Sequence, residues 1–203
     1  MSKNLLLSSA IILIAFFAPA QTKHIFTSIR PQLEKVINDY PNQFALIKGT
    51  QNEGEPNVIE YSSKVEIKNA VETKIIGYPA NKKIHWLWEA KLLVTEDTKE
   101  MQKQYKAYYN DILGKSLFSK GANNSITANG TYSAPSEELR LWSNQFFIKD
   151  VTGEFSKLVI DLVAEYQNFE WIIYLRVYDK EKDEEMRPTK DKNDPWRYGT
   201  NKN

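Results

Sequence analysis

The sequence contains no cysteine in its 203 residues. Disulfide bonds, thiol nucleophiles, iron–sulfur clusters and cysteine-ligated zinc sites are therefore excluded. A lipid anchor attached to an amino-terminal cysteine is excluded for the same reason. The fold must be stabilised by noncovalent interactions, and any chemistry must come from other side chains.

Histidine is almost as scarce, because only His24 and His85 are present. A Ser-His-Asp triad would have to use one of them, and no Gly-x-Ser-x-Gly motif supplies the serine. The sequence also lacks the His-Glu-x-x-His zinc motif, and its 8 glycines never form the Gly-x-Gly-x-x-Gly phosphate loop. We therefore expect neither a metal nor an organic cofactor.

An excess of charge of one sign is also missing. The net charge is +1, and residues 1–20 contribute one lysine and no acid, so the remainder carries 26 basic and 26 acidic side chains. A balanced chain has no long-range field that would hold a polyanion. We therefore expect no nucleic-acid partner.

Long apolar runs are limited to the amino terminus. Lys3 precedes the apolar run 5–17, and the small residues at 18–20 precede a cleavage point ahead of Gln21. This order is typical of a secretory signal peptide, whereas a membrane-spanning helix needs about 20 apolar residues. We expect residues 1–20 to be removed, which leaves an exported protein, periplasmic or secreted, without a stable membrane span. The alternative is an uncleaved membrane anchor.

Two stretches have apolar residues at the helical spacing of 0, 4, 7, 8 and 11. The first predicts a helix that starts near Ser28, a candidate N-cap, and is stopped by Pro41. The second predicts a helix from about Thr98, where Asp97 and Glu100 fit a capping box. The two stripes consist of Ile29, Leu33, Val36, Ile37 and Tyr40, and of Met101, Tyr105, Tyr108, Tyr109 and Ile112.

The residues after each helix favour β-strands. From residue 59, apolar or small residues alternate with polar ones, which is the period-two pattern of a half-buried strand. Two later runs alternate in the same way and carry Trp86 and Trp171 at corresponding places. We expect strands at 44–48, 59–67, 71–78, 84–94, 117–121, 142–148, 157–166 and 169–178.

One stretch of the sequence occurs twice. Residues 61–70 and 142–151 match without gaps, because an aromatic residue, a serine and Ile-Lys-Asn or Ile-Lys-Asp recur at the same positions. We interpret the chain as a duplication, with one helix-plus-four-strand unit at 21–94, a second at 95–178 and a flexible charged tail at 179–203. The alternative is that such short matches arise by chance.

This order of elements predicts an α+β fold of two tandem helix-plus-four-stranded antiparallel sheet repeats. The two sheets could join edge to edge into one continuous sheet with the helices on one face, which would hide two strand edges. The other face of an antiparallel sheet can remain in contact with water.

Because catalytic motifs are lacking, the surface is the best candidate for function. Tyrosine and arginine are common interface residues, and the strand faces predicted to point away from the helices carry both. The predicted partner-binding residues are Tyr174, Arg176, Tyr178, His85, Glu89 and Lys91. We therefore predict an exported, non-catalytic protein that binds a protein or glycan partner through an exposed sheet face.

Two other functional classes stay open. A carboxylate-dependent hydrolase would need only two acids across a cleft, and the sequence does not show which acids would be paired. The candidate acids are Glu60, Glu66, Glu72, Glu89, Asp161 and Glu165, of which Asp161 has apolar neighbours on both sides. The third class is a structural envelope component without a discrete ligand.

Overall fold

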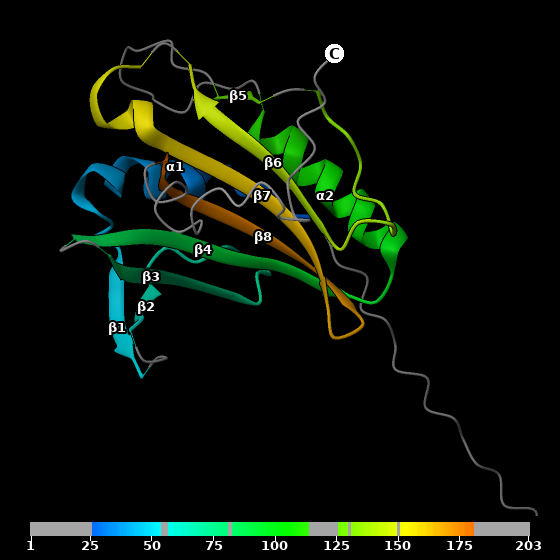
Figure 1. Ribbon diagram of the computed structural model, residues 1–203, viewed down its shortest axis with the longest axis horizontal. Helices are drawn as coiled ribbons and strands as arrows, with labels where there is room; N and C mark the ends of the chain where they lie inside the picture. Colours follow the sequence, from blue (N-terminus) through cyan, green and yellow to red (C-terminus); the bar gives the residue numbers. More distant parts are fainter. Residues whose placement is uncertain are drawn as a thin grey trace, which may run out of the picture.

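The computed structural model describes residues 26–53, 57–80, 83–113, 126–129, 131–149 and 151–180. Within these residues, one helix and four strands are followed by a second helix and four strands (Figure 1). The helices are α1 (Arg30–Asp39) and α2 (Thr98–Ile112), with the short 3-10 helices η1 (Tyr40–Asn42) and η2 (Gly153–Lys157). The strands are β1 (Lys48–Asn52), β2 (Ile59–Ser63), β3 (Glu72–Ala80), β4 (Lys83–Thr95), β5 (Ile126–Ala128), β6 (Leu141–Ile148), β7 (Leu158–Gln167) and β8 (Glu170–Asp179).

These eight strands form one antiparallel sheet in the order β1-β2-β3-β4-β8-β7-β6-β5. The long strands β4 and β8 lie at its centre and are paired with each other, with a bulge between Lys91 and Leu93. The short strands β1 and β5 form its two edges. The predicted α+β class is therefore confirmed, and the strands of both parts of the chain belong to one continuous sheet.

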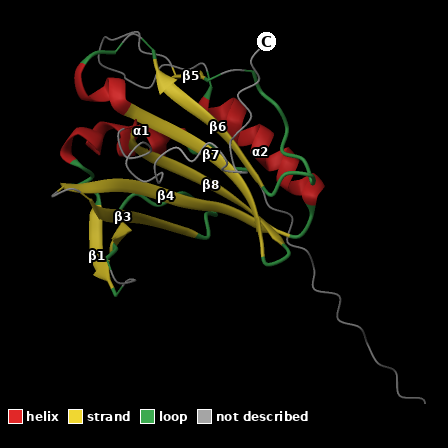
Figure 2. Ribbon diagram, in the orientation of Figure 1, coloured by secondary structure: helices red, strands yellow, loops and turns green. Residues whose placement is uncertain are grey.

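Both helices cover the same face of this sheet (Figure 2). Leu33 of α1 and Tyr105 of α2 belong to one apolar cluster together with Trp88 and Leu175 from the central strands, and all four side chains are fully buried. Burial of one large apolar side chain stabilises a fold by about 1.5–3 kcal/mol. This cluster is therefore the main core of the protein.

The start of α1 is capped by α2 rather than by the predicted side chain of Ser28. Ile29 is the N-cap residue and makes no side-chain cap bond. Instead, the carboxylate of Asp111 on α2 accepts hydrogen bonds from Ile29 N at 2.8 Å and from Ser28 Oγ at 2.9 Å. A negative charge at a helix N-terminus is favourable and satisfies a free backbone N–H. By contrast, Asp97 caps α2 as predicted, since it accepts hydrogen bonds from two backbone N–H groups.

The predicted strand at 44–48 is wrong, because this segment forms a turn and β1 begins only at Lys48. The Asp39 carboxylate accepts hydrogen bonds from the backbone N–H groups of Leu46 and Ile47, at 2.9 and 3.1 Å. N–H groups bound to a carboxylate are not available for pairing with a neighbouring strand. A single buried aspartate therefore delays the start of the first strand.

Strand β2 ends at Ser63, four residues before the end of the predicted strand. The Ser63 hydroxyl accepts a hydrogen bond from Val65 N and donates one to Val65 O, which turns the chain. Trp88 Nε1 also donates to Ser63 Oγ at 3.0 Å. Consequently Ile67 lies in the β2–β3 connection, whereas Ile148, its counterpart in the repeated stretch, is the last residue of β6.

Several predictions lie outside the described residues: the signal peptide at 1–20, the strand at 117–121 and the tail beyond Lys180. Strand β5 lies between the predicted strands at 117–121 and 142–148, where no strand was predicted. In the part of the chain that the structure describes, no helix is long and apolar enough to cross a membrane.

Candidate functional site

The face of the sheet that points away from the helices, here called the outer face, carries all six predicted partner-binding residues. Trp88 and Leu175 point into the core, so the side chains next to them along β4 and β8 point to the opposite side. The pairing of β4 with β8 then brings the predicted residues together. Glu89 lies opposite Arg176, Lys91 opposite Tyr174 and Leu87 opposite Tyr178, and His85 lies two residues beyond Leu87 on β4.

An ion pair lies at the centre of the outer face. Arg176 Nε donates a hydrogen bond to Glu89 Oε2 at 2.7 Å, and the Arg176 guanidinium lies 4.8 Å from the ring centroid of Tyr174. Burial by itself lowers the pKa of Arg176, but the negative charge of Glu89 and its hydrogen bond outweigh burial, so the pKa is raised overall. The guanidinium of Arg176 is therefore held in its charged form beside Glu89 on the adjacent strand.

This ion pair belongs to a longer row of charges. Lys74 is paired with Glu89 across β3 and β4, and Asp161 is paired with Arg176 across β7 and β8. The charged row therefore consists of Lys74, Glu89, Arg176 and Asp161, with alternating sign on four neighbouring strands. Opposite charges placed directly across strands stabilise a sheet by about 0.2–1 kcal/mol per pair.

Both ends of the charged row are held by additional partners. Lys74 Nζ lies 3.3 Å from a carboxylate oxygen of Glu60, and neighbouring acids raise the pKa of Lys74 although burial alone would lower it. At the other end, Asp161 accepts a hydrogen bond from Ser143 Oγ and another from Tyr178 OH at 3.4 Å. Each charge of the row therefore has a partner on an adjacent strand.

An apolar row runs beside the charged row. Ile76, Leu87, Tyr178 and Val159 are paired in register across β3, β4, β8 and β7, and all four are buried. Phe147 of β6 packs against the end of this row. The outer face therefore consists of parallel stripes that cross the strands, one apolar and one charged.

The six predicted residues differ in accessibility. His85, Glu89 and Tyr178 are buried, whereas Tyr174, Arg176 and Lys91 are only partly buried. The first three can shape the outer face and position their neighbours. Direct contact with a partner would fall to Tyr174, Arg176, Lys91 and the partly exposed Lys74.

The outer face also gathers five of the six acids considered for a hydrolase, because only Glu66 lies away from it, in the β2–β3 connection. Glu89 and Asp161 flank β8, so their backbones are separated by two strand spacings, or roughly 10 Å. Each of these two carboxylates already accepts a hydrogen bond from a neighbouring strand. This arrangement is that of a charge-pairing network around Arg176.

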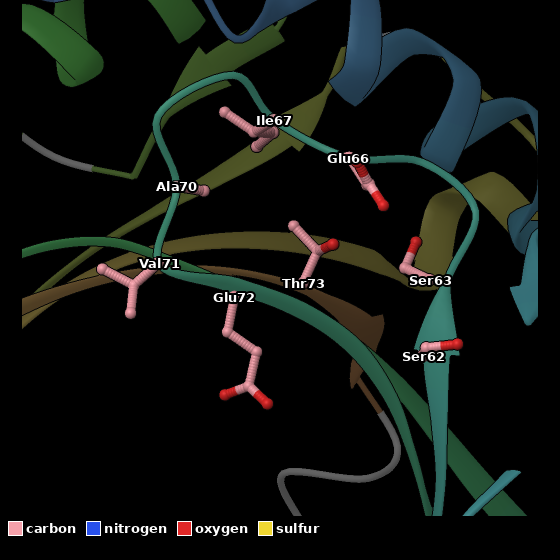
Figure 3. A pocket seen from close by; sticks show the side chains of 8 residues that line it. All are labelled: Ser62, Ser63, Glu66, Ile67, Ala70, Val71, Glu72 and Thr73. Atoms are coloured by element: carbon pink, nitrogen blue, oxygen red, sulfur yellow. The ribbon is translucent and has the colours of Figure 1, made fainter. Parts of the chain in front are cut away.

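The structure also contains a hollow that the sequence did not suggest. Its volume is about 270 Å³, and it lies between β2, β3 and the loop that connects them (Figure 3). It is lined by Ser62, Ser63, Glu66, Ile67, Ala70, Val71, Glu72 and Thr73. Among the described residues, no group of three or more histidines or acids could hold a metal ion. The hollow therefore offers hydroxyl groups and two carboxylates.

A second contact that sequence reasoning missed lies near the β1 edge of the sheet. Lys48 Nζ is 3.0 Å from the ring centroid of Trp86 and 5.5 Å from that of Tyr61. Burial lowers the pKa of Lys48, and the charge of Asp39 partly opposes this effect. A cation over aromatic rings is favourable, and this contact stabilises the packing of edge strand β1 against β2 and β4.

No known protein family, curated protein or solved structure matches the chain. Its function must therefore be argued from the chemistry of its own residues.

Proposed function

We propose that this protein is exported, has no catalytic role and binds a protein partner through the outer face of its sheet. The observation that carries the proposal is the charged row with Tyr174 beside it. Tyrosine and arginine supply much of the binding energy of protein interfaces, and here Arg176 is fixed by Glu89 before any partner arrives. A side chain that is already ordered loses little entropy on binding.

The charged row favours a protein over a glycan as the partner. Its partly exposed members are the two positive charges of Lys74 and Arg176, which lie two strand spacings apart, or roughly 10 Å, whereas Glu89 and Asp161 are buried. A protein surface can present two acids at the matching spacing, which gives specificity, whereas a neutral glycan has no charges to match them. Binding of a glycan and carboxylate-dependent hydrolysis are therefore the alternatives that the experiments below can detect.

We also propose that the sheet arose by duplication of a helix-plus-four-strand unit. The register supports this interpretation, since the offset of 85 residues that relates Trp86 to Trp171 also relates Ala90 to Leu175. These last two residues are paired with each other at the centre of the sheet, as expected for an approximate two-fold axis between β4 and β8. A superposition of 28–94 on 98–178 that fails to align these residues would contradict the duplication.

The binding proposal can be tested with a photoreactive residue at position 174. The matched control has the same residue at position 99, which is exposed on α2 and lies on the other side of the sheet. A protein cross-linked from 174 but not from 99 would then be purified and titrated against variants. We expect Tyr174→Ala combined with Lys91→Glu to weaken binding by about tenfold or more, and Lys99→Glu to leave it unchanged.

Other outcomes would assign the function elsewhere. Full affinity of the double variant would contradict a binding role for the outer face. Binding to a glycan array that depends on Tyr174 would replace the protein partner by a glycan. Hydrolysis of a glycoside substrate that is lost in both Glu89→Gln and Asp161→Asn would support the hydrolase instead. Export is tested separately, since the mature protein from its native cells should begin at Gln21.

A further inference from the structure

The turn between β7 and β8 holds a phenylalanine in a backbone conformation that this residue rarely adopts. Gln167 and Glu170 close the hairpin, so Asn168 and Phe169 form a two-residue turn with φ of 50° and 68°. Two positive φ values define the type I′ turn, in which asparagine suits the first position and glycine usually fills the second. A residue with a Cβ atom is strained in this left-handed region. Phe169 therefore costs stability where it stands.

Packing does not compensate for this strain. Phe169 is 84% exposed, which is the highest value among the large apolar side chains of the described residues. Leu139 is another exposed apolar residue, with an exposed fraction of 48%. It lies at the same end of the sheet, because Arg140, which follows Leu139 in the chain, accepts a hydrogen bond at its carbonyl from Tyr166 N. Backbone strain that the fold does not require is a reason to look for a function.

The base of the hairpin is firmly held. The rings of Tyr166 and Trp171 lie 5.1 Å apart at their centroids, and Trp171 Nε1 donates a hydrogen bond to Thr98 Oγ1 on α2 at 3.1 Å. The β7–β8 turn lies at the end of the sheet, close to where β4 leads into α2 (Figure 1). Phe169 is thus presented at a fixed position, so binding would cost little additional order.

Acidic residues lie at the same end of the sheet as this exposed ring. Glu170 follows Phe169 directly, Glu96 follows the last residue of β4, and Glu138 precedes Leu139. Thr95 is paired with Trp171, so Glu96 lies at the end of the sheet that carries the turn. Asp97 and Lys99 flank Thr98, which is bonded to Trp171, so this end has one further acid and two opposing positive charges, Lys99 and Arg140. This end of the sheet therefore carries net negative charge and favours a positively charged partner surface.

We infer that Phe169 is the anchor of a second interaction surface, which inserts one aromatic ring into an apolar pocket rimmed by lysine or arginine on a partner protein. The surface consists of Phe169, Leu139 and the acids Glu96, Glu138 and Glu170. It does not depend on the outer face. A membrane with anionic lipids would be repelled by these acids, which is why a protein is the occupant that the charges favour.

Stability measurements test the first part of this inference. Phe169→Gly removes both the ring and the strain, so we expect the melting temperature to rise by about 2–4 °C. Phe169→Ala removes the ring but keeps a Cβ at positive φ, so the melting temperature should stay near that of the wild type. A lower melting temperature for Phe169→Gly would show that the ring supports the fold and would overturn the inference.

Binding measurements test the second part. p-Benzoylphenylalanine at position 169 is used for cross-linking in the native cells, and the same residue at Leu46, which is 70% exposed, is the control. The protein captured only from position 169 is purified and titrated by calorimetry. We expect Phe169→Gly and Phe169→Ala each to weaken binding by at least about tenfold. A triple variant in which Glu96, Glu138 and Glu170 are replaced by Gln should weaken binding mainly at low salt.

Two results would overturn the inference without affecting the proposed binding role of the outer face. The first is unchanged affinity in Phe169→Gly. The second is flotation of the wild-type protein, but not of Phe169→Gly, with vesicles of neutral phosphatidylcholine, which would identify a lipid surface as the occupant. Tyr174→Ala should retain binding at Phe169, so failure of one surface can be distinguished from failure of the other.

Discussion

On the helix-covered face of the central strands, Trp88, Ala90 and Leu175 are fully buried, whereas on the outer face the residues between them form the charged and apolar rows. Both faces are made from the same strands, since side chains alternate along each strand. The helix-covered face is stabilised by packing against α1 and α2. The outer face is stabilised by pairs that lie side by side across the strands.

This difference assigns different tasks to the two faces. A face that is packed against helices cannot change without loss of the core. A face whose charges are satisfied by their strand neighbours can keep its geometry with or without a partner. Substitutions on the two faces should therefore differ in size and in kind, and three experiments can test this difference.

The largest effect is expected from the helix-covered face. Trp88→Ala removes a fully buried ring and the hydrogen bond to Ser63, so it should lower the free energy of unfolding by about 3–5 kcal/mol. The matched change on the outer face is Leu87→Ala, which removes the adjacent side chain from the smaller apolar row and should cost about 2 kcal/mol. Urea denaturation of both variants measures the two values. An equal or larger loss for Leu87→Ala would mean that the outer face is packed as deeply as the core.

A smaller difference is expected at alkaline pH. Burial, assisted by the charge of Asp111, raises the pKa of Tyr108 to about 12 from its ordinary value of 10.0, and burial also raises the pKa of Tyr105. A raised folded-state pKa contributes stability that is fully present below pH 10 and is lost as the pH rises through 12. For Tyr108 this loss is roughly 3 kcal/mol. It should be measurable by chemical denaturation over that pH window.

The outer face provides the control for this experiment. Burial raises the pKa of Tyr174, and nearby acids add to it, but Arg176 and Lys74 partly oppose the shift. We therefore expect Tyr108→Phe to flatten the alkaline loss of stability more than Tyr174→Phe does. A larger effect of Tyr174→Phe would show that Tyr174 on the outer face is more strongly desolvated than Tyr108 on the helix-covered face.

Local sequence patterns were sufficient to predict many elements. The second helix stripe predicted a helix from Thr98, and α2 spans Thr98–Ile112. Period-two alternation predicted the central strands and, as far as the bulge between Lys91 and Leu93 in β4, the face to which their side chains point. These features depend on neighbours within one helical turn or two strand positions, so a single stretch of sequence contains the necessary information.

Long-range features could not be predicted in the same way. The cap of α1 comes from Asp111, and β1 is delayed because Asp39 binds two backbone N–H groups. The charged row depends on the register between β4 and β8, whereas the sequence suggested only that two sheets could join. Cross-strand register is fixed by contacts between distant segments, so the predicted site residues could be assigned to one face but not to partners.

The smallest effect, and the finest test of the two faces, concerns the Glu89–Arg176 pair. Glu89→Gln, Arg176→Gln and the double variant form a double-mutant cycle, in which each single change removes one charge of the pair while Lys74 and Asp161 remain on either side. Because Glu89 is buried and the two side chains are 2.7 Å apart, we expect a coupling free energy of about 1 kcal/mol, with the double variant more stable than the two single losses would predict. Exposed ion pairs typically contribute only about 0.2–1 kcal/mol and weaken in salt. Urea denaturation with and without 1 M NaCl, which reduces the screening length to about 3 Å, distinguishes these cases.

A coupling that disappears in salt would mean that water reaches the pair, so that Arg176 is available to a partner at no cost to the fold. A coupling that persists would mean that Arg176 is part of the sheet itself and that Tyr174 and Lys91 must make the contacts.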